Sequence, residues 1–219
     1  MKKILFIMLL GLGLSLTGCL KDDDTTQYYG FGIVQPSTSG LWILTDDNHV
    51  LYGASGASTI EAGSRVYFLY SIVKEGAETD NFDYHVKWDD VYKVLTKNIF
   101  VINEVSRDTI GSDAVRVNNV WLAKNYLNVD LTYWGYSKTH YFNLVYDEES
   151  QTEPGAVVLE LKHKDNDDAE VNGYWGLVSF DLNSFDWTGT PPHKIKFKFK
   201  DYYSVVQSVD LSYTPPTEQ

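Results

Sequence analysis

Apolar and polar residues alternate along much of this chain with the two-residue period of β-strands. The clearest stretch is 194–200, where lysines alternate with Ile195, Phe197 and Phe199. The same period recurs at residues 126–134, 140–146, 157–162, 174–182 and 205–211. Successive strand side chains point to opposite faces, so each stretch is predicted to be a strand with one dry face. No stretch has a convincing helical period, which predicts an all-β protein whose C-terminal half is an antiparallel β-sandwich.

The N-terminal half has shorter apolar runs that predict a small barrel. These runs lie at residues 28–34, 41–44, 49–52, 65–73, 84–88 and 98–102. Residues 89–97 are expected to be a short helix or an irregular connector. Gly30 and Gly32 fall on one face of the first run, where glycine marks a bend or a close approach of two backbones. The pattern is compatible with an OB-type barrel.

The strand pattern weakens between the two halves, around Gly111. We therefore expect an OB-like β-barrel domain over residues 28–105, a linker over 106–117 and a β-sandwich domain over 118–219.

The first residues have the pattern of a bacterial lipoprotein signal peptide. Lysines at positions 2 and 3 precede an apolar run (4–16) and two small residues before Cys19. The run is too short for a membrane span, which needs about 20 apolar residues. Cys19 is the only cysteine, so in an oxidising compartment it has no internal disulfide partner. Residues 1–18 are thus predicted to be a signal peptide, and 19–27 a lipidated cysteine with an acidic tether; an ordinary secretory signal is the alternative.

The charge of the chain limits its partners. The formal net charge is −12, and it becomes −14 once residues 1–18, which hold two lysines and no acids, are removed. Nucleic acid is excluded, because binding phosphate backbones requires clustered lysine and arginine. Anionic lipid headgroups do not attract such a surface either. Membrane attachment is therefore expected through lipid on Cys19. One acyl chain holds a protein only weakly, so more than one chain is expected there, with palmitate among them.

No sequence motif marks a catalytic, metal or cofactor site. The five histidines are His49, His85, His140, His163 and His193. None has a close partner at metal-ligand spacing, and the chain has no nucleophile elbow or phosphate loop. No catalytic residue, metal or cofactor is predicted, and the chain is predicted not to be an enzyme. A pair of hydrolytic carboxylates stays open as an alternative, because 30 acidic residues offer many combinations.

Two charged stretches have simpler explanations than ligand binding. The lysines of residues 194–200 are expected on the solvated face of an edge strand, where lysine discourages unwanted pairing. Residues 165–168 are expected to form a polar hairpin loop. A calcium loop needs a glycine at its sharp turn, and Ala169 stands there.

Several segments resemble known families. Lys21, Asp22, Asp23 and Asp24, which follow Cys19, resemble the export signal of Bacteroidetes-type surface lipoproteins. The body resembles the NigD-like proteins at residues 30–32, 41–47, 63–66, 92–97, 126–129 and 159–163. The resemblance implies an N-terminal OB-type domain, a C-terminal β-sandwich and a place in the outer membrane, exposed at the cell surface. The family's origin in a bacteriocin-associated gene cluster implies an immunity role, and no catalytic motif is carried over.

Three classes of function fit these observations. The first is a surface-anchored, non-catalytic lipoprotein with an immunity-like or binding role toward an extracellular protein, peptide or glycan. The second is a cryptic hydrolase with an acid pair at the domain interface, which buried carboxylates facing each other would favour. The third is a structural subunit of an envelope or surface assembly, which an open sheet edge would favour. An exposed strip of aromatic residues would favour glycan binding.

Overall fold

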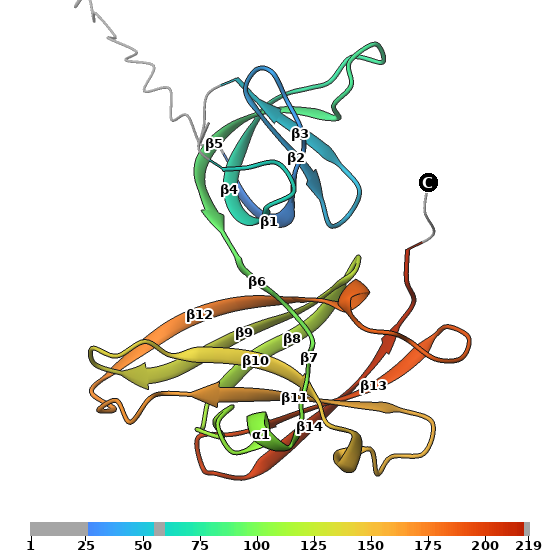
Figure 1. Cartoon of the computed structure of the whole chain (residues 1–219). Helices are drawn as coiled ribbons and strands as arrows, with labels where there is room; N and C mark the ends of the chain where they lie inside the picture. The colour runs from blue at the N-terminus through green and yellow to red at the C-terminus, as the bar shows by residue number, and fades with distance from the viewer. Residues whose placement is uncertain (1–25, 55–59, 217–219) are drawn as a thin grey trace, which may run out of the picture.

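The computed structural model describes residues 26–54 and 60–216 and consists of a barrel that lies over a β-sandwich (Figure 1). The barrel strands are β1 (Gln27–Val34), β2 (Leu41–Thr45), β3 (Val50–Gly53), β4 (Arg65–Glu75) and β5 (Tyr84–Lys93). They close in the order β1-β2-β3-β5-β4 around a core that includes Ile43, Leu51 and Phe68. The predicted OB-like barrel is confirmed. Residues 89–93 continue β5, so the helix or connector expected from residue 89 is wrong for them.

The two glycines of β1 allow the barrel to close tightly. A Cβ on Gly30 would lie 2.9 Å from the Phe68 ring, and one on Gly32 would lie 2.5 Å from both Ile43 Cγ2 and the Leu44 carbonyl oxygen. Side chains at these positions would displace the barrel core. The close approach predicted from the glycine pattern is therefore present.

The sandwich has two sheets. Its elements are β6 (Leu95–Asn98), β7 (Phe100–Val101), α1 (Glu104–Arg107), β8 (Arg116–Ala123), β9 (Tyr126–Gly135), β10 (Tyr141–Tyr146), η1 (Glu148–Ser150), β11 (Val157–Lys164), β12 (Asn172–Asp181), η2 (Leu182–Ser184), β13 (His193–Lys200) and β14 (Val206–Tyr213). One sheet has the order β6-β12-β9-β8, and the other has the order β14-β13-β11-β10-β7. The predicted β-sandwich is confirmed. Most neighbours are antiparallel, but β11 with β13, β12 with β6 and β10 with β7 are parallel.

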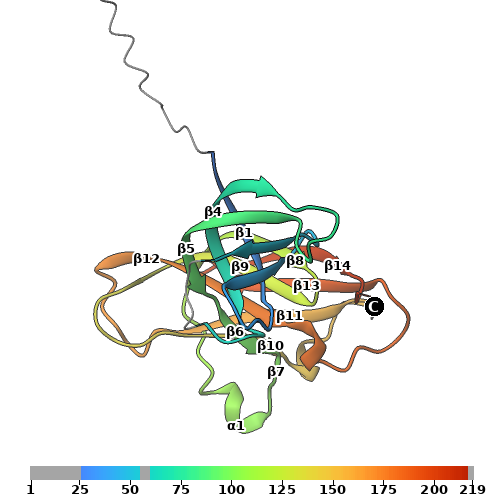
Figure 2. The same cartoon turned by 90° about the horizontal axis from the view of Figure 1, so that it is seen from above.

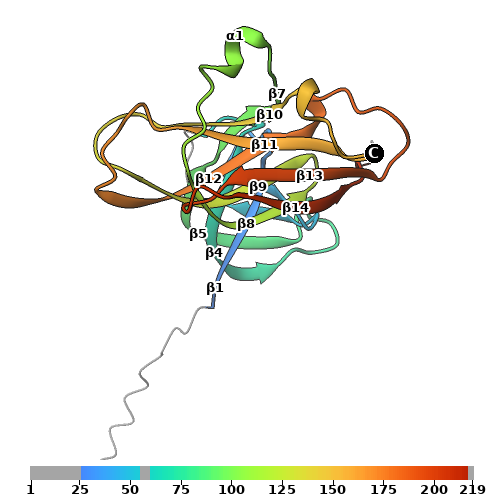
Figure 3. The ribbon, with the colours of Figure 1, turned by 90° about the horizontal axis from the view of Figure 1, so that it is seen from below.

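The barrel lies on the outer face of the β6-β12-β9-β8 sheet (Figures 1 and 2). The other sheet forms the far side of the molecule, as the view from below shows (Figure 3). Between the sheets, the alternating positions of β9 and β13 form the core: Leu127, Val129, Leu131, Ile195 and Phe197 are nearly inaccessible to solvent.

The sequence predicted that the lysines of β13 lie on an edge strand, and this prediction is wrong. β13 pairs with β11 on one side and β14 on the other, so it is an inner strand. Lys196 lies 3.4 Å from Glu153 and 3.6 Å from Asp210, so its charge is balanced by neighbouring acids. Because β13 has a neighbour on each side, Lys196 is explained by its carboxylate neighbours and not by protection of an open edge.

The strand pairing also differs from the expected division of the chain. β6 and β7 fall within residues 28–105, which were assigned to the barrel, yet they pair with β12 and β10 of the sandwich. Ile99, between them, is buried in the sandwich core. The expected linker, residues 106–117, includes the end of α1 and the start of β8. Its Val115 is buried and bonds to the Lys200 carbonyl oxygen at 3.0 Å.

Within the described residues, no helix is long and apolar enough to cross a membrane. The predicted signal peptide, residues 1–18, lies outside the described residues.

Candidate binding groove between barrel and sandwich

Arg65, the first residue of β4, joins the barrel to the sandwich. Its side chain is fully buried and forms a two-pronged ion pair with Asp46 of the barrel, at 2.7 and 2.8 Å. It also donates to Asn128 Oδ1 on β9 at 2.9 and 3.1 Å, and to Ser179 Oγ on β12 at 3.1 Å. Asn128 and Ser179 are register partners in the sandwich sheet. One guanidinium therefore contacts both units of the protein.

The surroundings of Arg65 make this contact specific. Its guanidinium carbon lies 4.5 Å from the centre of the Tyr126 ring, within cation–π range. Burial raises the pKa of the Tyr126 hydroxyl, so the ring stays neutral. A buried charge is tolerated only when it is paired and its hydrogen bonds are satisfied. The barrel is consequently held in one position on the sandwich sheet.

A groove lined by aromatic rings lies beside this joint. It has a volume of about 470 Å³, within the usual range for ligand sites. The barrel contributes Phe31 and Tyr67, and the sandwich contributes Trp121 and Trp175. The Phe31 and Trp121 rings are 5.2 Å apart, and the Tyr67 and Trp175 rings are 6.2 Å apart. Rings from both units therefore form one surface.

Asp130 on β9 is the polar centre of the groove. Its Oδ1 accepts hydrogen bonds from Trp175 Nε1 and Asn118 Nδ2, each at 2.9 Å. Within the described part of the chain, both of these hydrogen bonds go to Oδ1 and none goes to Oδ2. Asn118 also donates to Thr132 Oγ1 at 3.1 Å. These bonds hold Trp175 in place although 60% of it is exposed to solvent.

Strand alternation places these groups on one face. The sequence assigns Asn128, Asp130 and Thr132 to the polar face of residues 126–134, and this face lies toward the barrel. The exposed ring of Trp175 was not predictable, because its stretch reads as an ordinary half-buried strand. Its place opposite Thr132 follows only from the pairing of β12 with β9.

The groove is suited to binding and gives no support for hydrolysis. Asp130 is the one carboxylate among the described residues that line it. Glycoside hydrolysis of the usual kind requires two carboxyl groups on either side of the bond that breaks. The described residues that line this groove thus contain no acid pair of the kind that the hydrolase alternative requires.

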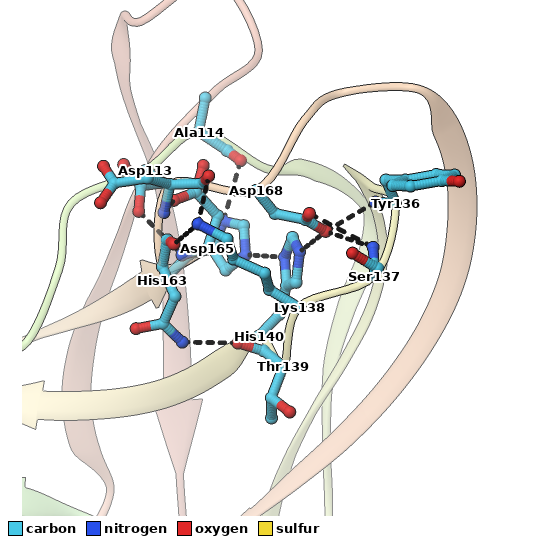
Figure 4. A network of polar contacts seen from close by, with 12 residues as sticks. Asp113, Ala114, Tyr136, Ser137, Lys138, Thr139, His140, His163, Asp165 and Asp168 are labelled. Atoms are coloured by element: carbon cyan, nitrogen blue, oxygen red, sulfur yellow. Dashed lines mark hydrogen bonds and ion pairs between the residues drawn. The ribbon is translucent and has the colours of Figure 1, made fainter.

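A second polar cluster lies at the end of the sandwich (Figure 4). His140 Nδ1 lies 2.8 Å from His163 Nε2, and His140 Nε2 lies 3.3 Å from Asp168 Oδ2. His163 Nδ1 lies 3.1 Å from the Ala114 carbonyl oxygen. The two histidines are 23 positions apart, so their contact was not visible as a spacing motif. The described residues contain no group of three or more side chains that could hold a metal.

One hydrogen bond of this cluster has a direction that its chemistry determines. The Ala114 carbonyl can only accept, so His163 Nδ1 donates to it. His140 lies between the other ring nitrogen of His163 and Asp168, with one of its own ring nitrogens facing each. Burial lowers the pKa of His163, and the Tyr136 backbone N–H holds the pKa of Asp168 far below its usual value.

This cluster fastens the connection between β9 and β10, which passes from one sheet of the sandwich to the other. Asp168 accepts from the backbone N–H groups of Tyr136 and Ser137 at 2.6 and 3.0 Å. It belongs to the acidic stretch expected to form a hairpin loop. That prediction is wrong, because β11 and β12, which the stretch connects, lie in different sheets.

The other residues predicted from the sequence to have a role lie outside the described residues. They are Cys19, Lys21, Asp22, Asp23 and Asp24.

Comparison with known proteins places the chain among proteins of the same architecture. A family model described as the NigD-like C-terminal β-sandwich domain matches residues 98–213. A protein of unknown function from Bacteroides vulgatus has a TM-score of 0.74 and 22% identity, covering 86% of this chain and 92% of that chain. No curated protein matches the chain.

Two further solved structures have informative descriptions. A NigD-like immunity protein from Bacteroides caccae has a TM-score of 0.65 and 20% identity, covering 88% of this chain and 98% of its own. A candidate lipoprotein from Bacteroides fragilis has a TM-score of 0.62 and 12% identity, covering 88% and 100%. At these identities the likeness establishes the common fold.

Proposed function

The chain belongs to the NigD-like family, and we propose that it is a non-catalytic lipoprotein, anchored at the cell surface, that binds an extracellular ligand in its aromatic groove. The exposed ring of Trp175 is the observation that carries this proposal. Large exposed apolar groups gathered in a hollow mark interaction sites. Arg65 and Asp130 fix the groove before any ligand arrives, which lowers the entropic cost of binding.

The proposed place and role have separate support. Lipid on Cys19 would hold the protein at the membrane, and a candidate lipoprotein from Bacteroides fragilis has the same fold. The acidic residues 22–24 support display on the outer surface of the outer membrane. An immunity-like role is favoured by the Bacteroides caccae protein, which is described as an immunity protein. In that role, the groove would bind an agent that threatens the cell.

The other functional classes have weaker support. Hydrolysis lacks a second carboxylate among the described groove residues. The edge strand β14 exposes Val206, but every open sandwich has edge strands, so this does not favour an assembly subunit over a binding protein.

A survival assay tests the proposal. A strain that lacks the gene would be complemented with the wild type, Trp175→Ala, Cys19→Ala or Tyr141→Ala and challenged with bacteriocin-producing competitors. Tyr141 is exposed on β10, in the other sheet, so it is a matched control. Wild type and Tyr141→Ala should protect, whereas Trp175→Ala and Cys19→Ala should not. Equal survival of the deletion strain would refute the immunity-like role. Full protection by Trp175→Ala would refute the groove as the site.

A further inference from the structure

The aromatic face of the sandwich continues beyond the groove, along β9. Gly173 of β12 pairs with Trp134, two positions further along the strand than the pair of Trp175 with Thr132. A Cβ on Gly173 would lie 3.5 Å from Trp134 Nε1 and 3.8 Å from Thr132 Cγ2. Trp134 therefore starts from the same outer face as Trp175, and the missing side chain at Gly173 leaves room beside it.

Trp134 belongs to a second hollow that is rich in aromatic rings. Its ring is 4.5 Å from that of Tyr202, in the turn between β13 and β14. Tyr202 is 47% exposed and its neighbour Tyr203 is 83% exposed. The hollow has a volume of about 660 Å³. A strand rises about 3.3 Å per residue, so Asp130 and Trp134 start about 13 Å apart on one face.

From this arrangement we propose that the ligand is a neutral oligosaccharide whose sugar rings extend along β9 from Trp175 to Trp134. The inference rests on the proposed function, because it names the ligand of the same groove. An aromatic ring has a negative face, which attracts the weakly positive C–H face of a sugar ring. The hydroxyl groups around that ring need polar partners beside the tryptophans.

Those polar partners are present. Thr132 lies opposite Trp175 in the strand pairing, and Asp130 and Asn118 lie next to it, on the side away from Trp134. A carboxylate oxygen accepts strong hydrogen bonds from hydroxyl groups. Polar groups therefore lie beside the first ring, that of Trp175, and the second ring, that of Trp134, follows two positions further along β9.

Charge and composition argue for a neutral sugar over other ligands. An acidic sugar beside Asp130 would face a carboxylate that has no ion pair among the described residues, in a chain of net charge −12. The centre of a protein–protein interface is usually depleted of charged residues, whereas here a carboxylate is at the centre. An extended face with two separate ring sites also fits a chain of repeating units.

Calorimetric titration of the lipidated protein in detergent tests this inference. The probes are maltose to maltohexaose, cellobiose to cellohexaose and mannobiose to mannohexaose, with oligogalacturonides of equal length as acidic counterparts. Affinity for at least one neutral series should rise with chain length. Trp175→Ala should weaken binding at every length by about tenfold or more. Trp134→Ala should remove only the gain from the longer chains, and Tyr141→Ala should bind as the wild type does.

Asp130→Asn tests the charge argument. It removes the negative charge while keeping an oxygen acceptor, so the difference in affinity between the neutral and the acidic sugars should become smaller. Equal wild-type affinity for oligogalacturonides would overturn the neutral ligand. Binding of sugars that Trp175→Ala leaves unchanged would overturn the groove as the sugar site.

The sugar inference and the proposed function fail in different ways. If no neutral series binds but Trp175→Ala still abolishes protection in the survival assay, the sugar ligand is wrong and the groove retains its role toward another class, such as a protein. If Trp175→Ala changes neither sugar binding nor survival, both are wrong.

Discussion

Arg65 Nη2 in the barrel lies 2.9 Å from Asn128 Oδ1 in the sandwich, and this pair joins two segments 63 positions apart. The barrel and the sandwich have separate hydrophobic cores, so no shared core joins the two units. The buried guanidinium, balanced by Asp46, supplies a directional contact in its place. The groove depends on this contact, because its rings come from both units.

Arg65→Met should destabilise the protein by about 3–5 kcal/mol. It removes the charge that buried Asn128 and Ser179 face, and it leaves Asp46 without its partner. Urea unfolding followed by tryptophan fluorescence would measure the loss. Arg107→Met is the matched control. Arg107 also bridges two acids, but its side chain is 35% exposed and solvent screens both pairs, so the loss in Arg107→Met should be much smaller. Equal losses in the two variants would contradict a special role for the buried joint.

Gly32→Ala should destabilise the barrel by about 1–3 kcal/mol, because its Cβ would overlap Ile43 and the Leu44 carbonyl. Gly173→Ala is the control, since its Cβ meets only ordinary contacts, at 3.5 Å and beyond. Thermal unfolding of both variants checks this. A Gly32→Ala protein as stable as Gly173→Ala would show that β1 does not pack as tightly as described.

Local patterns predicted the parts of the fold that depend on local chemistry. The alternation in residues 194–200 identified which side chains of β13 are buried, and Gly30 and Gly32 identified the close approach in the barrel. Pairing partners are not local. The apolar run at 98–102 has a pattern that fits a strand of either unit. It was assigned to the barrel, which was wrong, because its residues pair and pack with the sandwich.

The candidate site was less predictable for the same reason. Arg65 looks like one charge at the start of an apolar strand, and nothing near it in sequence indicates Asn128 or Ser179. The exposure of Trp175 follows from the cross-strand neighbour and from where the barrel lies. Both facts come from tertiary structure.

Stability should fall as the pH drops below about 6.5, the ordinary pKa of histidine in an unfolded chain. Burial lowers the pKa of His163, so the unfolded state binds a proton there more readily than the folded state does. The contribution of His163 is complete above pH 6.5 and is lost as the pH falls toward its lowered pKa. Asp168, whose pKa is also lowered, should lose its contribution only below about pH 4.

His163→Asn tests the first of these windows. An asparagine amide can still donate to the Ala114 carbonyl but does not titrate. It leaves His140 Nδ1 without its partner, so stability at pH 7.5 should fall by about 1–3 kcal/mol. Urea unfolding at pH 7.5, 6.5 and 5.5 should show a flatter profile than the wild type. An unchanged slope in His163→Asn would place the pH dependence elsewhere.

Cys19→Ala should abolish membrane attachment, because a body of net charge −14 has no electrostatic attraction to anionic headgroups. Fractionation should find this variant soluble or with its signal retained, and recovery of unlipidated native protein would refute the anchor. Replacement of Asp22, Asp23 and Asp24 by alanine is expected to keep the lipid but reduce display at the surface. Protease shaving of intact cells separates the two steps. If the alanine variant and the wild type are cleaved equally, the acidic run does not direct export, and the lipid on Cys19 alone would account for the location of the protein.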